Sequence, residues 1–241
     1  MVWRGAERTM RMRLKTLKGR LWPSTLVVFP TLGHRRRVTP VSRIWGMDRG
    51  KPIDRHYIEI FMSENAKDIH GRVLEIEDNR YTIQYGSDVT RSDILHVSNW
   101  DPGVTIVADL TAAEEIESDI FDCIVLTQTL QVIYEVPAAL STLYRILKPR
   151  GVLLATFPGI SQIAREGMES WPDHWRFTKS SAERLFSEVF SAENVAVQVY
   201  GNVLAATAFL YGLAAEELKE WELDYRDPDY QLLITARAVK H

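Results

Sequence analysis

The chain has 241 residues, of which 46% are hydrophobic and 25% are charged, and this composition suits one globular α/β domain with an extension. No run of about 18 apolar residues occurs, which argues against a membrane span, and the first residues lack the apolar segment of a secretory signal. The single cysteine, Cys123, stands in an apolar run, so we expect a buried thiol and a reducing, cytoplasmic location.

Charge is distributed unevenly along the chain. Residues 1–50 hold twelve Lys or Arg and two acidic residues, a net charge of +10, whereas the remainder carries −13. We therefore predict a basic N-terminal extension over residues 1–40 and an acidic domain over residues 41–241. The extension could contact an anionic partner or fold back on the acidic domain. Few aromatic residues interleave its basic residues, which disfavours a nucleic-acid platform.

Short apolar runs separated by helix-length segments predict an open, mostly parallel sheet with helices on both faces. In chain order, the expected strands are RVLEI (72–76), a weaker SDILHVS (92–98), VTIVADL (104–110), FDCIVLTQTL (121–130), GVLLATFPG (151–159), VAVQVYG (195–201) and YQLLITARAVK (230–240). The expected helices are 139–147, 178–190 and 203–219. Pro149 and Gly151 end the first of these helices.

The turn after the first expected strand is acidic and has no glycine. Glu77 and Asp78 occupy the position where a dinucleotide site would have glycines, and they would repel a diphosphate. NAD and ATP are therefore disfavoured. S-adenosylmethionine carries a sulfonium and an ammonium group instead of phosphates, so an acidic turn suits it. We expect Asn79 to adopt the left-handed conformation that a glycine would otherwise supply.

Polar residues also gather where the expected strands end, which is where open parallel sheets bind their ligands. Glu75, inside an apolar strand, needs a partner, either a bound ammonium group or an arginine such as Arg72 or Arg80. Asp109 could contact a ligand or simply cap the turn that follows it.

The runs VLEIEDNRYT, IVADL, FDCIVLTQTLQ and ILKPRG, with the lead-in WGMDRGKPIDRHYIE, resemble class I S-adenosylmethionine-dependent methyltransferases. The bacterial branch often found beside or fused to glycosyltransferases is the most similar. The resemblance covers roughly residues 41–240. It implies a Rossmann-like seven-stranded sheet with six parallel strands and one antiparallel strand, with S-adenosylmethionine lying across the ends of the first strands.

The resemblance also implies the site residues. Glu75 would face the methionyl end, Asp109 would meet the adenine amino group, and Gln128 would face the methyl donor. The complete set expected to bind the cofactor is Glu75, Glu77, Asp78, Tyr81, His96, Asp109, Leu110 and Gln128. This chain departs from the family pattern in two ways. Glu77 replaces the usual glycine, and the acid that holds the ribose is absent, leaving His96 or Asp93 as substitutes.

A hydroxyl acceptor needs a base, and His174 in SWPDHWRFT is the candidate catalytic residue. The same segment could instead be an aromatic clamp formed with Trp171 and Trp175. His56 and Tyr57 of the lead-in could also reach over the site or lie on a helix surface. The sequence shows no motif for a bound metal.

Three functions remain open. The favoured one is a methyltransferase acting on a small molecule, such as a sugar, glycoside or natural product, at oxygen. The second is a related cyclase, isomerase or lyase of natural-product biosynthesis. The third is a non-catalytic subunit docked through the basic extension. We expect a small-molecule acceptor, no nucleic acid and no membrane span, with a homo-oligomer or a glycosyltransferase as possible partners.

Overall fold

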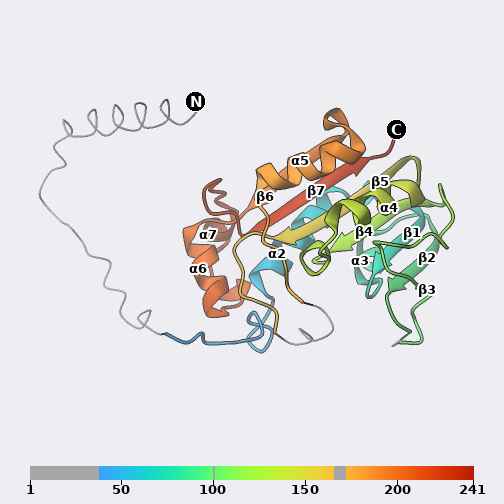
Figure 1. Cartoon of the computed structure of the whole chain (residues 1–241). Helices are drawn as coiled ribbons and strands as arrows, with labels where there is room; N and C mark the ends of the chain where they lie inside the picture. The colour runs from blue at the N-terminus through green and yellow to red at the C-terminus, as the bar shows by residue number, and fades with distance from the viewer. Residues whose placement is uncertain (1–37, 100, 166–171) are drawn as a thin grey trace, which may run out of the picture. The chain divides into compact units, whose positions relative to one another are not determined.

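The computed structural model describes residues 38–99, 101–165 and 172–241, so the predicted basic extension lies outside the described residues except for residues 38–40. Residues Thr39–His241 form one compact unit. Its seven strands make one sheet in the order β3-β2-β1-β4-β5-β7-β6 (Figure 1). The strands are β1 (Gly71–Ile76), β2 (Val89–His96), β3 (Ile106–Val107), β4 (Phe121–Thr127), β5 (Leu147–Pro158), β6 (Val195–Tyr200) and β7 (Leu233–Val239).

Only β7 among these strands runs against the others. It pairs antiparallel with both β5 and β6, while β1, β2, β3, β4 and β5 pair in parallel. The predicted sheet of six parallel strands and one antiparallel strand is therefore confirmed. The carboxyl ends of the parallel strands meet at one edge, and this edge carries the candidate site.

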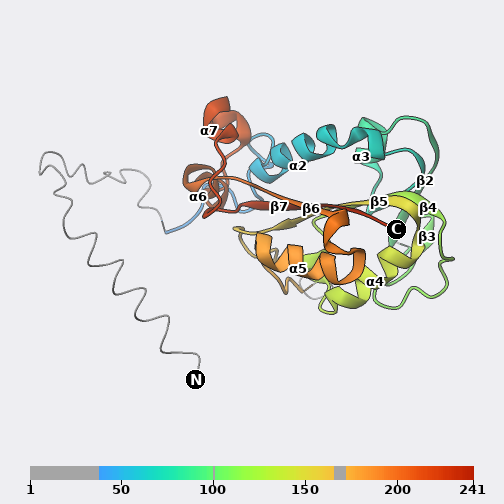
Figure 2. The ribbon, with the colours of Figure 1, turned by 90° about the horizontal axis from the view of Figure 1, so that it is seen from above.

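Helices cover both faces of the sheet, as predicted. Figure 2 shows α2 and α3 on one face and α4 and α5 on the other. The helices are α2 (Ile53–Glu64), α3 (Arg80–Tyr85), α4 (Val136–Ile146), α5 (Lys179–Phe190), α6 (Val203–Tyr211) and α7 (Glu220–Asp224). Thr178 caps α5 by accepting a hydrogen bond from the N–H of Ser181 at 3.2 Å.

Alternate residues of the central strands build two separate cores. Leu74 and Ile124 belong to the core beneath α4 and α5, and Val73 and Cys123 belong to the core beneath α2 and α6. All four side chains are fully buried, which confirms the prediction that Cys123 is a buried thiol. Burial on both faces explains why these strands are continuously apolar in sequence.

The structure corrects two element predictions. Residues 92–96 of the segment predicted to be the weaker strand lie in the eight-residue β2. The segment 104–110 contributes only the two-residue β3, which pairs with β2 alone at the edge of the sheet. The helix predicted over 203–219 ends at Tyr211, because Gly212 adopts a left-handed conformation with φ of 73°. A Cβ at Gly212 would lie 2.3 Å from the carbonyl oxygen of Ser42.

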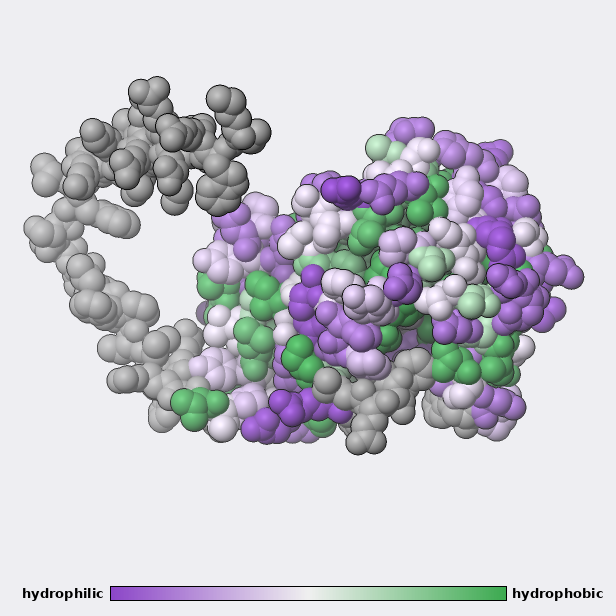
Figure 3. Space-filling model, viewed as in Figure 1, coloured by the Kyte–Doolittle hydropathy of each residue, from purple (hydrophilic) through white to green (hydrophobic). Residues whose placement is uncertain are grey.

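On the face seen in Figure 3, apolar patches are interspersed with hydrophilic residues. None of the helices within residues 38–99, 101–165 and 172–241 combines the length and the apolar character needed to cross a bilayer.

Candidate functional site

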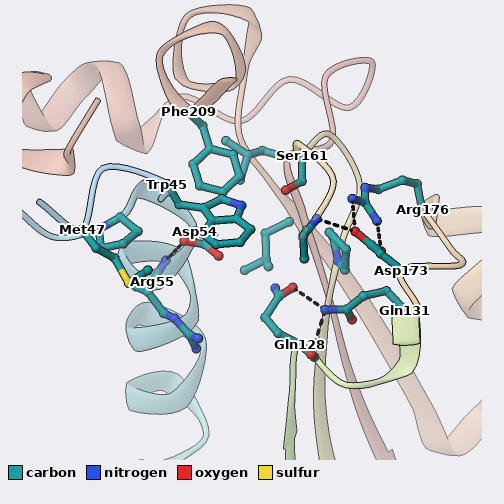
Figure 4. A pocket seen from close by; sticks show the side chains of 15 residues that line it. Trp45, Met47, Asp54, Arg55, Gln128, Gln131, Ser161, Asp173, Arg176 and Phe209 are labelled. Atoms are coloured by element: carbon teal, nitrogen blue, oxygen red, sulfur yellow. Dashed lines mark hydrogen bonds and ion pairs between the residues drawn. The ribbon is translucent and has the colours of Figure 1, made fainter. Parts of the chain in front are cut away.

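Two cavities open at the carboxyl edge of the sheet. The larger, about 480 Å³, lies at the ends of β1 and β2 and against the segments that follow β3 and β4. The smaller, about 200 Å³, lies between the turn at Trp45, the first turn of α2 and the segments that follow β4 and β5 (Figure 4). Gln128, directly after β4, lines both cavities, so the two meet at this residue.

The larger cavity collects five of the eight residues predicted to bind the cofactor. These residues are Glu77, His96, Asp109, Leu110 and Gln128. They come from four segments that are distant in sequence, and the parallel sheet brings them to one edge. Their contact with a cofactor remains a prediction. Glu75, Asp78 and Tyr81 are not among the lining residues of either cavity.

The carboxylate of Glu75 is hydrogen-bonded by neighbouring groups of the protein itself. This carboxylate is buried and accepts hydrogen bonds from the N–H of Tyr81 at 3.1 Å, from the N–H of Thr82 at 2.8 Å and from the hydroxyl of Thr82 at 2.7 Å. It therefore satisfies backbone donors at the start of α3. Burial raises the pKa of Glu75 to about 7, although these hydrogen bonds oppose the rise.

The expected arginine partners of Glu75 bind other carboxylates, so that pairing prediction is wrong. Arg80 donates from Nη2 to Oδ2 of Asp78 at 2.5 Å, which turns Asp78 toward Arg80. Burial alone would raise the pKa of Asp78, but hydrogen bonds from Arg80 outweigh it and hold the pKa below its ordinary value. Arg72 donates from Nε to Oδ2 of Asp93 at 2.7 Å.

Asp93 cannot substitute for the missing ribose acid, which corrects one of the two alternatives. Its side chain is fully buried and also accepts hydrogen bonds from Arg91 at 2.9 Å and from the hydroxyl of Thr105 at 3.0 Å. His96 lies three residues further along, at the end of β2, and lines the larger cavity. Its Nδ1 accepts a hydrogen bond from the N–H of Ser98 at 3.0 Å. His96 is therefore the substitute that the geometry favours.

The left-handed residue of the acidic turn is Glu77, with φ of 74°. Asn79, the predicted left-handed residue, has φ of −120°, so that prediction is wrong. The physical reason is position: Glu77 directly follows β1, and the chain must turn there whatever the residue. The N–H of Glu77 donates to the carbonyl of Leu95 at 3.1 Å, which fixes the turn against β2. Its exposed side chain borders the larger cavity without filling it.

Asp109 caps its own turn and lines the larger cavity at the same time. Its Oδ1 accepts from the N–H and from the hydroxyl of Thr111, both at 2.8 Å. Its Oδ2 has no hydrogen bond to any residue that the structure describes. One oxygen therefore holds the turn and the other remains available to a ligand. Leu110 beside it is buried and adds an apolar wall.

Gln128 joins the two cavities in a strained conformation. Its φ is 48°, which is uncommon for a residue other than glycine. The carbonyl of Gln128 accepts a hydrogen bond from Nε2 of Gln131 at 2.7 Å. The Nε2 atom of Gln128 and the Oε1 atom of Gln131 are buried and have no hydrogen-bond partner among the residues that the structure describes. Buried polar atoms of this kind are rare in native structures and point to a missing partner.

His174, the predicted base, lines neither cavity. Its exposed ring packs edge-on against Tyr134 with ring centroids 5.3 Å apart, and Trp175 stacks on the same Tyr134 at 5.6 Å. The backbone N–H groups of His174 and Trp175 donate to the carbonyl of Gln131 at 2.8 and 3.1 Å. This geometry matches the aromatic-clamp alternative. Trp171, the other predicted clamp residue, lies outside the described residues.

Asp54 is a functional candidate that the sequence analysis missed. It stands in the first turn of α2 and lines the smaller cavity, and its Oδ1 accepts a hydrogen bond from the N–H of Arg55 at 2.8 Å. Burial raises the pKa of Asp54. The lead-in WGMDRGKPIDRHYIE contains Asp54, but the candidates predicted from it were His56 and Tyr57. Tyr57 is instead buried and donates to the carbonyl of Leu223 at 2.9 Å.

Three of the seven described non-glycine residues in left-handed conformations line these cavities. Trp45, Glu77 and Gln128 are non-glycine residues in left-handed conformations, and each lines one cavity or both. The hydroxyl of Ser42 accepts hydrogen bonds from the N–H groups of Ile44 and Gly46, both at 3.2 Å, and thereby stabilises the turn that carries Trp45. Strain of this kind is characteristic of functional sites.

No group of three or more His, Cys, Asp or Glu side chains is placed to hold a metal ion within the described ranges.

Comparison with solved structures finds several chains of similar fold at low sequence identity. A phosphoethanolamine N-methyltransferase 2 from Haemonchus contortus is 17% identical with a TM-score of 0.46, over 71% of this chain and 49% of that one. An S-adenosylmethionine-dependent methyltransferase from Mesorhizobium loti is 13% identical with a TM-score of 0.49, over 81% and 100%. The [4+2]-cyclase SpnF is 14% identical with a TM-score of 0.49, over 80% and 83%.

This chain thus spans about half the length of the Haemonchus enzyme. No curated protein matches the sequence. The family model described as a methyltransferase domain matches residues 43–199, which include β1 to β5 and all of β6 except its last residue. The chain therefore belongs to this methyltransferase-domain family.

Proposed function

We propose that the protein transfers a methyl group from S-adenosylmethionine, the cofactor of its family, to a hydroxyl group of a small molecule. The observation that carries the proposal is the charge of the larger cavity. Glu77, Asp109 and Glu135 line it, and none of its described lining residues is Lys or Arg. Such a cavity repels a diphosphate and attracts the sulfonium and ammonium groups of S-adenosylmethionine.

The residues present also fit the uncharged parts of this cofactor. A cavity of about 480 Å³ is within the usual range of small-molecule sites. Oδ2 of Asp109 can accept a hydrogen bond from an adenine amino group, and Leu110 and Ile133 offer apolar contact to a flat ring. His96 ends β2 and lines the cavity, and we assign the ribose hydroxyls to it.

The smaller cavity is the proposed acceptor site. Gln128 belongs to both cavities, so a molecule in the smaller one lies directly beside the larger one. When bound, the cofactor supplies an already activated methyl group on its sulfonium. The protein then contributes mainly alignment and the exclusion of water, and both require adjoining, partly enclosed sites.

A hydroxyl acceptor also has to lose a proton, and we assign this role to Asp54 in place of His174. Asp54 lines the smaller cavity, and its first oxygen is held by the N–H of Arg55. Burial raises its pKa, which brings a carboxylate closer to the range useful for general-base catalysis near neutral pH.

Calorimetric titration tests the proposal. We expect S-adenosylmethionine and S-adenosylhomocysteine to bind, and ATP and NAD not to bind. Binding of NAD or ATP instead of the adenosyl compounds would contradict the acidic-cavity argument. Binding of the adenosyl compounds without methylation of any member of a broad hydroxyl panel would favour a cyclase, isomerase or lyase. Absence of all binding would favour a non-catalytic subunit.

A further inference from the structure

We propose that the smaller cavity binds one uncharged, polyhydroxylated ring, of the size of a single sugar unit, and that a hydroxyl of this ring is the methyl acceptor. This inference rests on the proposed function for the transfer step, but the binding of the ring stands on the smaller cavity alone.

The hydrogen-bonding capacity of the cavity is incomplete in the protein. Nε2 of Gln128, Oε1 of Gln131 and Nε of Arg176 are buried and have no partner within residues 38–99, 101–165 and 172–241, and all three residues line the smaller cavity. Two of these atoms donate hydrogen bonds and one accepts. A hydroxyl group both donates and accepts, so a ligand with neighbouring hydroxyls offers partners of both kinds to these three side chains. A purely apolar ligand would leave them all unsatisfied.

The formal charges of the described lining residues balance, which argues against a charged ligand. Asp173 is bound to Arg176 through two contacts of 2.5 and 2.7 Å, so this pair is already neutralised. Asp54 and Arg55 form the other pair of opposite charges on the lining, and Nη1 of Arg55 donates to the hydroxyl of Tyr81 at 3.2 Å. A phosphate or an ammonium group would bring an uncompensated charge into a partly enclosed space.

The shape of the cavity suits a ring with one apolar face and a polar edge. Trp45 and Phe209 lie on one side and Gln131 and Arg176 on the other, with Asp54 beside the indole of Trp45 (Figure 4). The volume is about 200 Å³, and a cavity of about 150 Å³ is known to hold benzene. The C–H groups of a sugar-like ring can therefore pack on the aromatic side while its hydroxyls meet the amide and guanidinium groups.

The transfer step balances with the groups already named. The acceptor oxygen forms a bond to the methyl carbon while the bond between that carbon and sulfur breaks, and the electron pair stays on sulfur. The sulfonium becomes a neutral thioether. The hydroxyl proton moves to the carboxylate of Asp54 and then to water.

Saturation-transfer NMR with the protein loaded with S-adenosylhomocysteine tests the inference. The probes are a neutral methyl hexoside, the matching hexose 6-phosphate and the matching amino sugar. We expect saturation of the ring protons of the neutral probe and at least tenfold weaker binding of the two charged probes. This comparison needs no variant. Preferred binding of a charged probe, or no binding of the neutral one, would overturn the inference.

A matched pair of variants locates the binding. Gln131→Met removes the unpaired oxygen from the cavity and should weaken the neutral probe about tenfold. Gln84→Met makes the same change on the exposed side of α3 and should leave the probe's affinity unchanged. Equal affinity in both variants would place the probe elsewhere and contradict the inference.

Repeating both measurements without S-adenosylhomocysteine separates the two proposals. Ring binding by a protein that does not bind S-adenosylhomocysteine would support the ring site and refute the proposed methyl transfer. Binding of S-adenosylhomocysteine by a protein that does not bind the neutral ring would refute the ring site and leave the proposed methyl transfer standing.

Discussion

The two cavities that meet at Gln128 differ in charge and in how completely their polar groups are paired. The larger cavity has three carboxylates and no Lys or Arg among its described lining residues, whereas the smaller has two Asp and two Arg. In the larger cavity, Asp109 is bonded to Thr111 and His96 to Ser98. In the smaller cavity, Gln131 and Arg176 each keep a buried atom that has no partner in the described part of the chain.

This difference suggests two kinds of binding. Side chains that are already held by their own backbone are pre-organised for one ligand, which suits a cofactor shared by a whole family. Buried atoms that lack a partner are satisfied only when the correct ligand enters, which suits discrimination between acceptors, because a wrong ligand leaves them unpaired. The larger cavity would therefore supply affinity for the cofactor and the smaller one selectivity for the acceptor.

The largest expected effect is on stability and concerns the ion pair between Asp173 and Arg176, which lines the smaller cavity. Asp173 has a side chain 2% exposed and Arg176 one 25% exposed, so Arg176→Leu leaves a buried carboxylate without its partner. We expect the free energy of unfolding in urea to fall by about 3 kcal/mol. Arg184→Leu breaks the exposed pair with Glu188 and should cost at most about 0.5 kcal/mol. Similar losses in both variants would show that the pair is not structural.

The second effect concerns Glu75 and depends on pH. Its pKa is raised from 4.5 to about 7 in the folded protein, chiefly by burial. The protonated form is therefore favoured by folding, so its contribution to stability is complete below pH 4.5 and is lost as the pH rises toward 7. Relative to Glu75→Gln, which does not titrate, the wild type should lose up to about 3 kcal/mol over this window. A difference that does not change with pH would refute the shift.

The third effect separates the two roles of Asp109. Asp109→Ala removes both the turn cap and the proposed acceptor for the adenine amino group, and should weaken S-adenosylhomocysteine binding by about 1–3 kcal/mol. Asp109→Asn keeps an oxygen for Thr111 but replaces the free oxygen with a donor. Calorimetric titration should therefore show weakened binding of S-adenosylhomocysteine in both variants. Only Asp109→Asn should keep the thermal stability of the wild type. Normal affinity of Asp109→Asn for S-adenosylhomocysteine would show that Asp109 only caps its turn and does not bind the cofactor.

The smallest effect concerns Glu77. Glu77→Gly relieves a left-handed conformation that costs about 1–2 kcal/mol, partly offset by the flexibility of glycine, so the unfolding free energy should rise by about 0.5 kcal/mol. Because a carboxylate is lost, affinity for cationic S-adenosylmethionine should fall more than affinity for S-adenosylhomocysteine. Asp88→Gly, with φ of 54° in a turn lining neither cavity, should match the stability change without changing either affinity. Equal changes in both affinities for Glu77→Gly would contradict the charge argument.

The same contrast explains what the sequence could predict. Continuous apolar runs such as those containing Leu74 and Ile124 record burial on both faces, so the sheet and its order of elements could be read from them. Asp109 could be selected because ligands bind at the carboxyl ends of parallel strands. The larger cavity is built almost wholly from such ends and was therefore largely predictable.

The smaller cavity was not predictable in this way, because it depends on side-chain direction. In the sequence, Asp54 looks like an ordinary acid in the first turn of a helix. It lines the smaller cavity only because α2 packs beside the edge of the sheet. His174 has the right residue type near the right strand, but its ring packs on Tyr134 outside both cavities. Glu75 was chosen because it lies inside an apolar strand, but its hydrogen bonds to Tyr81 and Thr82 depend on how α3 packs beside β1, which no local pattern reveals.

A crystal structure with S-adenosylhomocysteine bound tests the central claim most directly, because it shows which cavity holds which part of the reaction. The account predicts adenine beside Asp109, ribose beside His96 and the thioether sulfur at Gln128, facing the smaller cavity. Adenosine bound away from the larger cavity, or the Glu77 side chain occupying it so that the methionyl portion cannot enter, would contradict the account.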